Sequence, residues 1–316
     1  MNVDLANLDS HHQLLFAIPL RPVQGQRFQP TGFPDLGHAV YETPQGTCLL
    51  VESAQSMANR LESACWDDAQ QRPIAPLHGL SYVRVEQTGK YLTSSMVEAH
   101  RINSPYILEG KDRAFFAILK QELGAMEKGP IDRPALARTL FKYDVGSLVH
   151  GVFLAKKELA GGRLRVARAL SAFIEASNAR VALSGGVKND HIDPSGDTNR
   201  GFGNVPFHRE DFTADQITLY ANLDLAQVRG YGLGAEVTRL LVLLSLFKLR
   251  ALLDSKLRLR TACDLCVVSE RIVSTNADGF ALPLRRDLEQ ELGPAIRQCS
   301  SLFAGNAGVT TVRYQG

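Results

Sequence analysis

A long polar stretch between two apolar runs constrains the fold of this chain more than any other feature. It extends from Ser184 to Arg209, is rich in Gly, Asn, Asp, Pro and His, and lies between runs typical of β-strands, 169–176 and 217–228. Loops of this length are uncommon inside compact domains and are usually functional or disordered. Disorder fits poorly because five apolar side chains interrupt the stretch. These are Val187, Ile192, Phe202, Val205 and Phe207. We therefore expect an ordered segment that is suited to binding a polar polymer.

The net charge limits how the chain can bind a polyanion. Its 316 residues, 45% hydrophobic and 22% charged, are typical of a globular protein with one large domain or two small ones. The formal charge is only +2, so any nucleic-acid site must be a local basic surface. Two basic clusters are candidates, although such charge runs are also typical of solvated faces. They comprise Lys156, Lys157, Arg163, Arg165 and Arg168, and Lys248, Arg250, Lys256, Arg258 and Arg260.

The sequence predicts a cytoplasmic protein. The first residues, MNVDLANLDSHHQLLF, lack a basic region followed by a long apolar run. The longest apolar block, 240–247, is far shorter than the ~20 residues of a membrane-spanning helix. The cysteines are odd in number and scattered, which indicates reduced thiols. They are Cys48, Cys65, Cys263, Cys266 and Cys299.

Apolar periodicity predicts an α+β chain. Strands are expected at 14–20, 47–51, 81–85, 169–176, 217–228 and 257–268. Helices are expected after Ser53, a favourable N-cap residue, and at 113–123, 134–143, 233–253 and 287–299. Strand, helix, strand, followed later by strand, helix, strand, is compatible with a ferredoxin-like core that carries large insertions.

Motifs typical of cofactor sites are incomplete. Gly230, Gly232 and Gly234 form G-x-G-x-G, not the G-x-G-x-x-G of dinucleotide-binding folds. They predict a turn entering a helix, or a turn that contacts phosphate. Cys263 and Cys266 lie in an expected strand, where side chains three residues apart face opposite sides, so two small buried residues are favoured over a zinc or redox pair.

Catalytic motifs are also weak. Asp190, His191, Asp193 and His208 could be assembled into a metal-dependent hydrolase, but the stretch 184–209 contains no His-x-x-x-His or paired acidic motif. No serine lies in a G-x-S-x-G elbow. We expect no metal and no cofactor.

Several loops mix guanidinium, amide and aromatic groups. Residues 21–29 carry Arg21, Gln24, Arg27, Phe28 and Gln29, and residues 98–105, EAHRINSP, are similar. Such mixtures suit single-stranded RNA, where phosphates need donors and unstacked bases need flat surfaces. Any one of these loops could equally be hydrogen-bonded within the fold, and it is the recurrence at four or five loops that favours RNA.

Long motifs in the chain resemble one family. They are RPVQGQRFQPTGFPDLG, VESAQSMANRLE, SSMVEAHRINSPYI, LVHGVFLA, SGGVKNDH, GNVPFHRE, RGYGLG and LRLRTACDL, from about Arg21 to about Leu265. Together they resemble the backbone RAMP subunit of type I CRISPR effector complexes (Cascade), of the subtype called U and later G. The resemblance is to a family of CRISPR-associated proteins and covers nearly the whole chain.

The resemblance implies an RNA-recognition-like (ferredoxin-like) palm with large finger and thumb insertions. It implies a single RAMP-type domain over 1–316, with a finger-like region at about 88–165 and a thumb-like loop at about 184–212. Copies would stack in a helical filament along the crRNA guide and present it for pairing with target DNA. The other expected partners are a large subunit and the RAMP subunit that caps one end of the crRNA.

The resemblance also bears on the chemistry. Related subunits of type III systems cut RNA with a loop acid, for which Asp190, Asp193 and Asp35 are candidate analogues here, whereas type I relatives are non-catalytic. The resemblance therefore implies no enzymatic activity, with a metal-dependent RNA endonuclease that uses loop acids as the alternative. A protein-only assembly module remains a third hypothesis. For RNA contact we expect arginine and lysine to hold phosphates, Asn and His to bond sugars or bases, and aromatic rings to stack. The expected residues are Arg21, Arg27, Phe28, Arg60, His100, Arg101, Lys188, Asn189, His191, Asn204, His208, Arg209, Arg229 and Tyr231.

Overall fold

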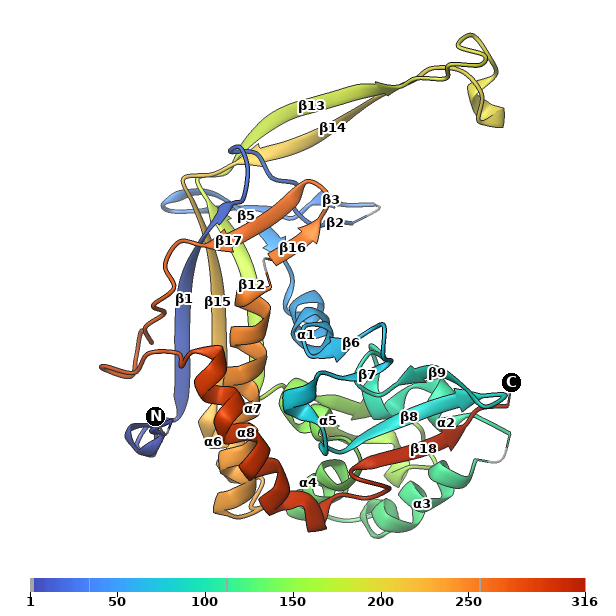
Figure 1. Ribbon diagram of the computed structural model, residues 1–316, viewed down its shortest axis with the longest axis vertical. Helices are drawn as coiled ribbons and strands as arrows, with labels where there is room; N and C mark the ends of the chain where they lie inside the picture. Colours follow the sequence, from blue (N-terminus) through green and yellow to red (C-terminus); the bar gives the residue numbers. More distant parts are fainter. Residues whose placement is uncertain (1–2, 34, 112, 256, 316) are drawn as a thin grey trace.

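A seven-stranded sheet forms the centre of the computed structural model, which describes residues 3–33, 35–111, 113–255 and 257–315 (Figure 1). The order of its strands is β16-β17-β1-β15-β12-β5-β4. In chain order the strands are β1 (Gln13–Pro22), β4 (Val40–Thr43), β5 (Gly46–Glu52), β12 (Leu170–Ser177), β15 (Gln216–Asp224), β16 (Leu257–Arg260) and β17 (Cys263–Val267). The expected mixture of helices and strands is confirmed, as are the strands predicted at 14–20, 47–51 and 169–176.

Four adjacent strands, β17-β1-β15-β12, pair antiparallel throughout. In the chain, α1 (Ala54–Ser63) lies between β1 and β12, and α7 (Ala235–Asp254) lies between β15 and β17. The order is therefore strand, helix, strand, strand, helix, strand, with β5 and β4 added at the edge beside β12. Ser53 caps α1 as predicted, because its hydroxyl accepts a hydrogen bond from the Ser56 N–H at 3.3 Å.

The sheet has one covered face and one open face. Alternate residues of β1 from Leu14 to Leu20 are buried, whereas those between them are more accessible. The helix α1 contacts β12, and α7 packs against both α1 and α8 (Arg285–Cys299), so these helices cover the apolar face. On the open face, the rings of Phe173 and Tyr220 stack with centroids 5.2 Å apart.

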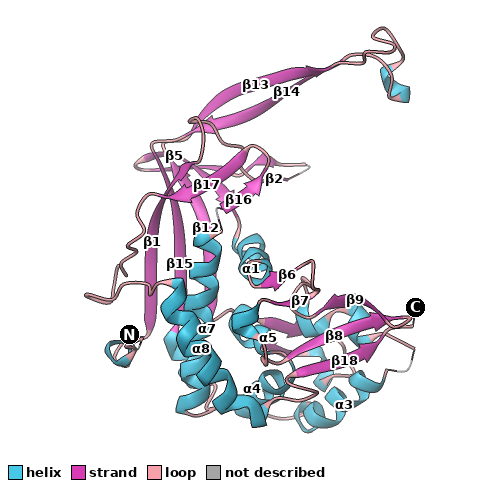
Figure 2. Cartoon of the chain, in the orientation of Figure 1, coloured by secondary structure: helices cyan, strands magenta, loops and turns pink. Residues whose placement is uncertain are grey.

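A second region is built around a three-stranded sheet of order β18-β8-β9. Its strands are β8 (Tyr82–Gln87), β9 (Lys90–Ser94) and β18 (Val309–Arg313), and β18 pairs with β8 in parallel. Four helices surround it, α2 (Pro105–Leu108), α3 (Ala114–Leu123), α4 (Arg133–Tyr143) and α5 (Val145–His150). The C-terminal strand thus returns to this region, which is predominantly helical outside its sheet (Figure 2).

Separate two-stranded antiparallel pairs complete the architecture. They are β2 (Gly32–Phe33) with β3 (Gly37–His38), β6 (Trp66–Asp67) with β7 (Arg72–Pro73), β10 (Val152–Leu154) with β11 (Leu164–Val166), and β13 (Arg180–Lys188) with β14 (Val205–Thr213). The last pair projects beyond the body of the molecule, as Figure 1 shows at the top of the view. We call the segment from Arg180 to Thr213 the arm.

Three secondary-structure predictions are wrong in extent. The stretch from Ser184 to Arg209 is not one loop: 184–188 and 205–209 pair in the β13–β14 hairpin, and 189–204 form its tip. The strand expected at 217–228 ends at Asp224, whose side chain caps the short helix α6 (Leu225–Gly230). The strand expected at 257–268 is a hairpin of β16 and β17. In each case the apolar content was recognised, but the position of the turn was not.

The second basic cluster is not a solvated face. Lys248 is 2% exposed and Arg250 is 3% exposed, both on the buried helix α7. Arg250 donates hydrogen bonds to the carbonyl oxygens of Leu282 and Pro283 and forms an ion pair with Asp254. Lys256 lies outside the described residues, and Arg258 and Arg260 lie on β16.

Candidate nucleic-acid interface

The arm is a two-stranded ribbon with solvent on both faces. The nine residues of β13 pair with those of β14 in register from Arg180 opposite Thr213 to Lys188 opposite Val205. At about 3.3 Å per residue, the ribbon is about 30 Å long. Nearly all side chains of β13 are exposed or half-buried, so the ribbon has no core of its own. The arm therefore presents main-chain and side-chain groups far from the sheet that carries it (Figure 2).

Asp190 organises the tip of the arm. Its carboxylate accepts hydrogen bonds from the N–H groups of Ile192, Asp193 and Gly203 at 2.9, 3.1 and 2.9 Å. These bonds lower the pKa of Asp190, because they favour the ionised form. The Asn204 side chain accepts a hydrogen bond from the Asp190 N–H at 2.7 Å. Both Asp190 and Asn204 thus hold the turn, which is an alternative to a catalytic or RNA-contacting role.

Charge does not explain what the arm binds. From Lys188 to Arg209, three basic residues are balanced by three aspartates. Affinity for a polyanion that depends on counterion release needs a net positive surface, which this segment lacks. The arm instead exposes large apolar side chains, including Ile192 at 97% and Leu183 at 76%. Large exposed apolar side chains of this kind are available for contact with another molecule.

A polar groove of about 470 Å³ lies at the root of the arm. Its lining includes Arg27, Arg209 and Arg258, with Asp211 and Asp264 as the acids. Arg209 forms an ion pair with Asp211, whose carboxyl is almost fully buried, with Nε and Oδ1 3.1 Å apart. Arg27 and Arg258 are exposed. The groove thus offers two accessible guanidinium groups beside the arm.

The structure brings some predicted residues to this root and gives Phe28 another role. Phe28 is 1% exposed, and its N–H and carbonyl pair with those of Phe212 at 2.9 and 2.8 Å. It therefore anchors the 23–31 loop to β14 and cannot stack on RNA in this conformation, which corrects the expectation. Arg258 was not among the predicted contacts. Its sequence signal was its place in the basic cluster and in the motif LRLRTACDL.

Three further predicted contacts are also used within the fold. Arg101 is 4% exposed and bonded to Glu62. Tyr231 is 7% exposed and donates a hydrogen bond to the Leu148 carbonyl at 2.7 Å, and burial raises its pKa to about 12. Arg60 donates to the Leu259 carbonyl at 2.7 Å and pairs with the buried Glu52. Local sequence could not reveal most of these partners, because Glu62, Leu148 and Leu259 lie 39 to 199 residues away from the side chains that they bind.

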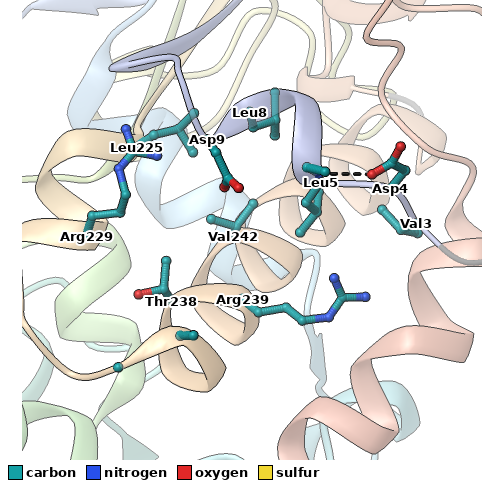
Figure 3. Close-up of a pocket in the computed structure, with 13 residues that line it drawn as sticks. Val3, Asp4, Leu5, Leu8, Asp9, Leu225, Arg229, Thr238, Arg239 and Val242 are labelled. Atoms are coloured by element: carbon teal, nitrogen blue, oxygen red, sulfur yellow. Dashed lines mark hydrogen bonds between the residues drawn. The ribbon is translucent and has the colours of Figure 1, made fainter.

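Arg229 is likewise occupied. Figure 3 shows it at the edge of a hollow of about 780 Å³, formed by the N-terminal segment and the start of α7. Its guanidinium donates a hydrogen bond to the His11 carbonyl. Another lining residue, Arg239, pairs with Glu291 at 2.7 Å. The lining also includes Asp4 and Asp9, so this hollow does not favour a polyanion.

The remaining predicted contacts are accessible but dispersed. Lys188, Asn189, His191 and His208 are exposed on the arm. Arg21 is exposed near the end of β1, opposite Cys266 of β17. His100 is exposed and lines a different groove, beside β10 and β11. The candidate site is therefore the arm with its root, and Arg21 and His100 lie outside it.

Metal-binding clusters and membrane-spanning helices are absent from the described residues. No group of three or more His, Cys, Asp or Glu side chains there is placed to hold a metal ion. No helix in the described part of the chain is both long and apolar enough to cross a membrane.

Cys263 is buried, burial raises its pKa to about 11, and Cys266 is half-buried. Both are free thiols, and the expected burial is found for Cys263 but not for Cys266.

Comparison with known proteins gives one family match. A family model described as CRISPR-associated protein GSU0053 (Cas_GSU0053) matches residues 14–181. A solved structure described as a CRISPR RNA-guided surveillance complex, pre-nicking, is 14% identical with a TM-score of 0.42, over 82% of this chain and 74% of that chain. The crystal structure of Thermofilum pendens Csc2 is 8% identical with a TM-score of 0.36, over 96% of this chain and 80% of that chain. No curated protein matches the sequence.

Proposed function

Because this chain belongs to the family of CRISPR-associated protein GSU0053, we propose that it is a non-catalytic, RNA-binding backbone subunit of a type I CRISPR effector complex. Copies of the chain polymerise along the crRNA guide and present it for pairing with target DNA. The complex also contains a large subunit and a RAMP subunit that caps one end of the crRNA. Membership confirms the resemblance to CRISPR-associated RAMP subunits, and it is the observation that carries this proposal.

A ferredoxin-like palm is part of the proposal. The chain order β1, α1, β12, β15, α7 and β17 supports it, because strand, helix, strand, strand, helix, strand is the order of that core. The finger-like region is proposed at about 88–165. The arm takes the place of the expected thumb-like loop at 184–212.

The arm and its root are proposed to make different contacts with RNA. Arg27 and Arg258 hold phosphates at the root, and Lys188, His191 and His208 add contacts along the arm. The exposed apolar residues of the arm contact bases or a neighbouring copy, since a neutral ribbon gains little from the phosphate charge alone. Polymerisation multiplies weak contacts, so few cations are needed in each copy.

The test is co-expression of the chain with its partner subunits and a CRISPR array. We expect purified complexes to contain guide-length RNA of repeat–spacer sequence, detected by absorbance at 260 and 280 nm and by sequencing. The variant Lys188→Ala with His208→Ala should reduce bound RNA while the fold persists, because both side chains are exposed. Arg209 is left intact, because its loss would leave the buried Asp211 without its ion pair.

The control and the competing functions are resolved in the same preparation. Lys120→Ala with Lys128→Ala removes exposed charge outside the arm and should leave RNA content unchanged. Magnesium-dependent cleavage of the bound RNA or of a complementary strand, abolished by Asp193→Asn, would establish the endonuclease instead. Oligomers that survive nuclease treatment and carry no RNA would establish a protein-only module.

A further inference from the structure

A second groove lies beside the β10–β11 hairpin and the start of β12, apart from the arm. Its volume is about 780 Å³, and a hollow of about 410 Å³ that shares Arg133 and Arg165 adjoins it. No carboxylate is present among the described residues that line either one. A concave surface with one sign of charge concentrates the opposite sign, so the groove favours an anion. The charged and titratable residues that line the larger groove are His100, Arg101, Arg133, His150, Arg165 and Arg168.

Not all of these cations are available. Arg101 is neutralised by Glu62, with which it makes two hydrogen bonds. Arg168 donates to the Gln55 side chain, and its Nε is buried without a hydrogen-bond partner among the described groups. Arg133 and Arg165 are exposed, and neither makes an ion pair within the described part of the chain. Two free guanidinium groups and one partly used group therefore face the groove.

An aromatic ring lies next to this charge. Phe153 lines the groove and is 54% exposed, which is unusual for so large an apolar side chain. It is paired directly opposite Arg165 in the β10–β11 ladder, so the two side chains project from the same face. Val152 and Leu154, its neighbours in β10, are buried on the other face. The hairpin thus presents a flat ring and a guanidinium side by side.

A buried polar group completes the groove. His150 is 1% exposed, lines the groove, and has no hydrogen-bond partner for either ring nitrogen among the described residues. A neutral imidazole carries one donor and one acceptor, and buried groups of this kind are normally paired. Burial, with the charges of Lys248, Arg101 and Arg168, holds the pKa of His150 well below its ordinary value. The ring is therefore a neutral donor and acceptor that a polar ligand can satisfy.

We propose that this groove is a nucleotide-binding site. The base stacks on Phe153, and the phosphate is held by Arg133, Arg165 and Arg168. His150 forms a hydrogen bond with a sugar hydroxyl or a base edge. Phosphate alone would use the guanidinium groups but would leave the exposed ring and the buried imidazole without a partner. The nucleotide belongs either to a bound RNA strand or to the free pool. Only the RNA source rests on the function proposed above, whereas the site rests on its own residues.

The first experiment measures binding of uridine monophosphate and of inorganic phosphate to the full chain by calorimetry. We expect uridine monophosphate to bind more tightly than phosphate, since stacking adds to the phosphate contacts. Phe153→Ala and Arg165→Glu should each weaken it about tenfold. Lys157→Glu is the matched control, because it reverses an exposed charge outside the groove and should change nothing. Circular dichroism verifies that each variant is folded.

The second experiment separates the two sources. RNA containing 4-thiouridine is cross-linked to the co-expressed complex, and the modified peptide is mapped. A cross-link near Phe153 that Phe153→Ala abolishes assigns a nucleotide of the strand, and mononucleotide binding without that cross-link assigns a free nucleotide. The proposal is overturned if both groove variants bind uridine monophosphate and cross-link as the Lys157→Glu control does. Loss of RNA in the arm variant with unchanged groove binding would separate the two sites.

Discussion

The buried ion pair between Arg101 and Glu62 should control the stability of the whole chain. Arg101 Nε and a terminal nitrogen donate to the two Glu62 carboxylate oxygens at 2.9 and 2.8 Å, and the other terminal nitrogen donates to the Gly151 carbonyl at 3.2 Å. The two side chains are 5% and 4% exposed. The backbone of Arg101 is left-handed, with φ of 50°, a conformation that surrounding contacts must stabilise. The pair thus joins α1 to the loop that precedes α2.

Removing one partner should be strongly destabilising. A buried charge left uncompensated costs about 3–5 kcal/mol. Unfolding entropy is about 2.1 cal/mol/K per residue, or about 0.66 kcal/mol/K for 316 residues. The expected fall in melting temperature for Arg101→Met or Glu62→Met is therefore about 5–8 °C. Replacing both by methionine should recover part of this loss, because no unpaired charge remains from the pair.

Urea denaturation and differential scanning calorimetry of the two single variants and the double variant measure these changes. The coupling energy from the double-mutant cycle should be about 2 kcal/mol or more. Single variants within about 1 kcal/mol of the wild type, or a double variant equal to the sum of the singles, would refute the reasoning. RNA binding below the melting temperature should persist in Arg101→Met, because the guanidinium is an internal group.

Three other perturbations test separate parts of the structure. His150 has its pKa held low by burial and neighbouring cations, so the unfolded chain binds the extra proton. Stability should therefore fall below about pH 6.5, by at most about 1.4 kcal/mol per pH unit. The urea midpoint should change less between pH 7.5 and pH 5.5 in His150→Gln than in the wild type. An equal change in the two proteins would contradict this role of His150. Gly203→Ala should disrupt the arm tip, because a Cβ would lie 2.4 Å from the Gly196 oxygen at φ of +82°. Amide hydrogen exchange at the tip should be faster in Gly203→Ala than in the wild type. Gly201→Ala should have the smaller effect on this exchange, because a Cβ at Gly201 would meet open space. Phe28→Ala should cost about 3–5 kcal/mol, measured by denaturation, because the ring is fully buried; a loss below 1 kcal/mol would mean that the loop is not anchored there.

Elements with strong local signals could be predicted from the amino-acid sequence. Alternation along 14–20 predicts β1 because one face of that strand is buried, and Ser53 predicts the start of α1 because its hydroxyl satisfies a free N–H. The apolar spacing over 233–253 predicts α7 for the same reason. The motifs also identified the family, which depends on residue identity along the chain and not on contacts.

The availability of a polar side chain to a ligand depends on tertiary contacts, which could not be predicted from the sequence. Arg101 and Arg165 both lie in basic or polar stretches. Arg101 nevertheless forms a buried ion pair with Glu62, whereas Arg165 is exposed beside Phe153. His150 and Phe153 both occur in the motif LVHGVFLA, but the motif does not indicate that they share a groove with Arg165. Burial and pairing depend on which distant segments meet, and strand register alone places Phe153 opposite Arg165. The chemistry of a side chain is written in the sequence, but its accessibility is set by the neighbours that the fold provides.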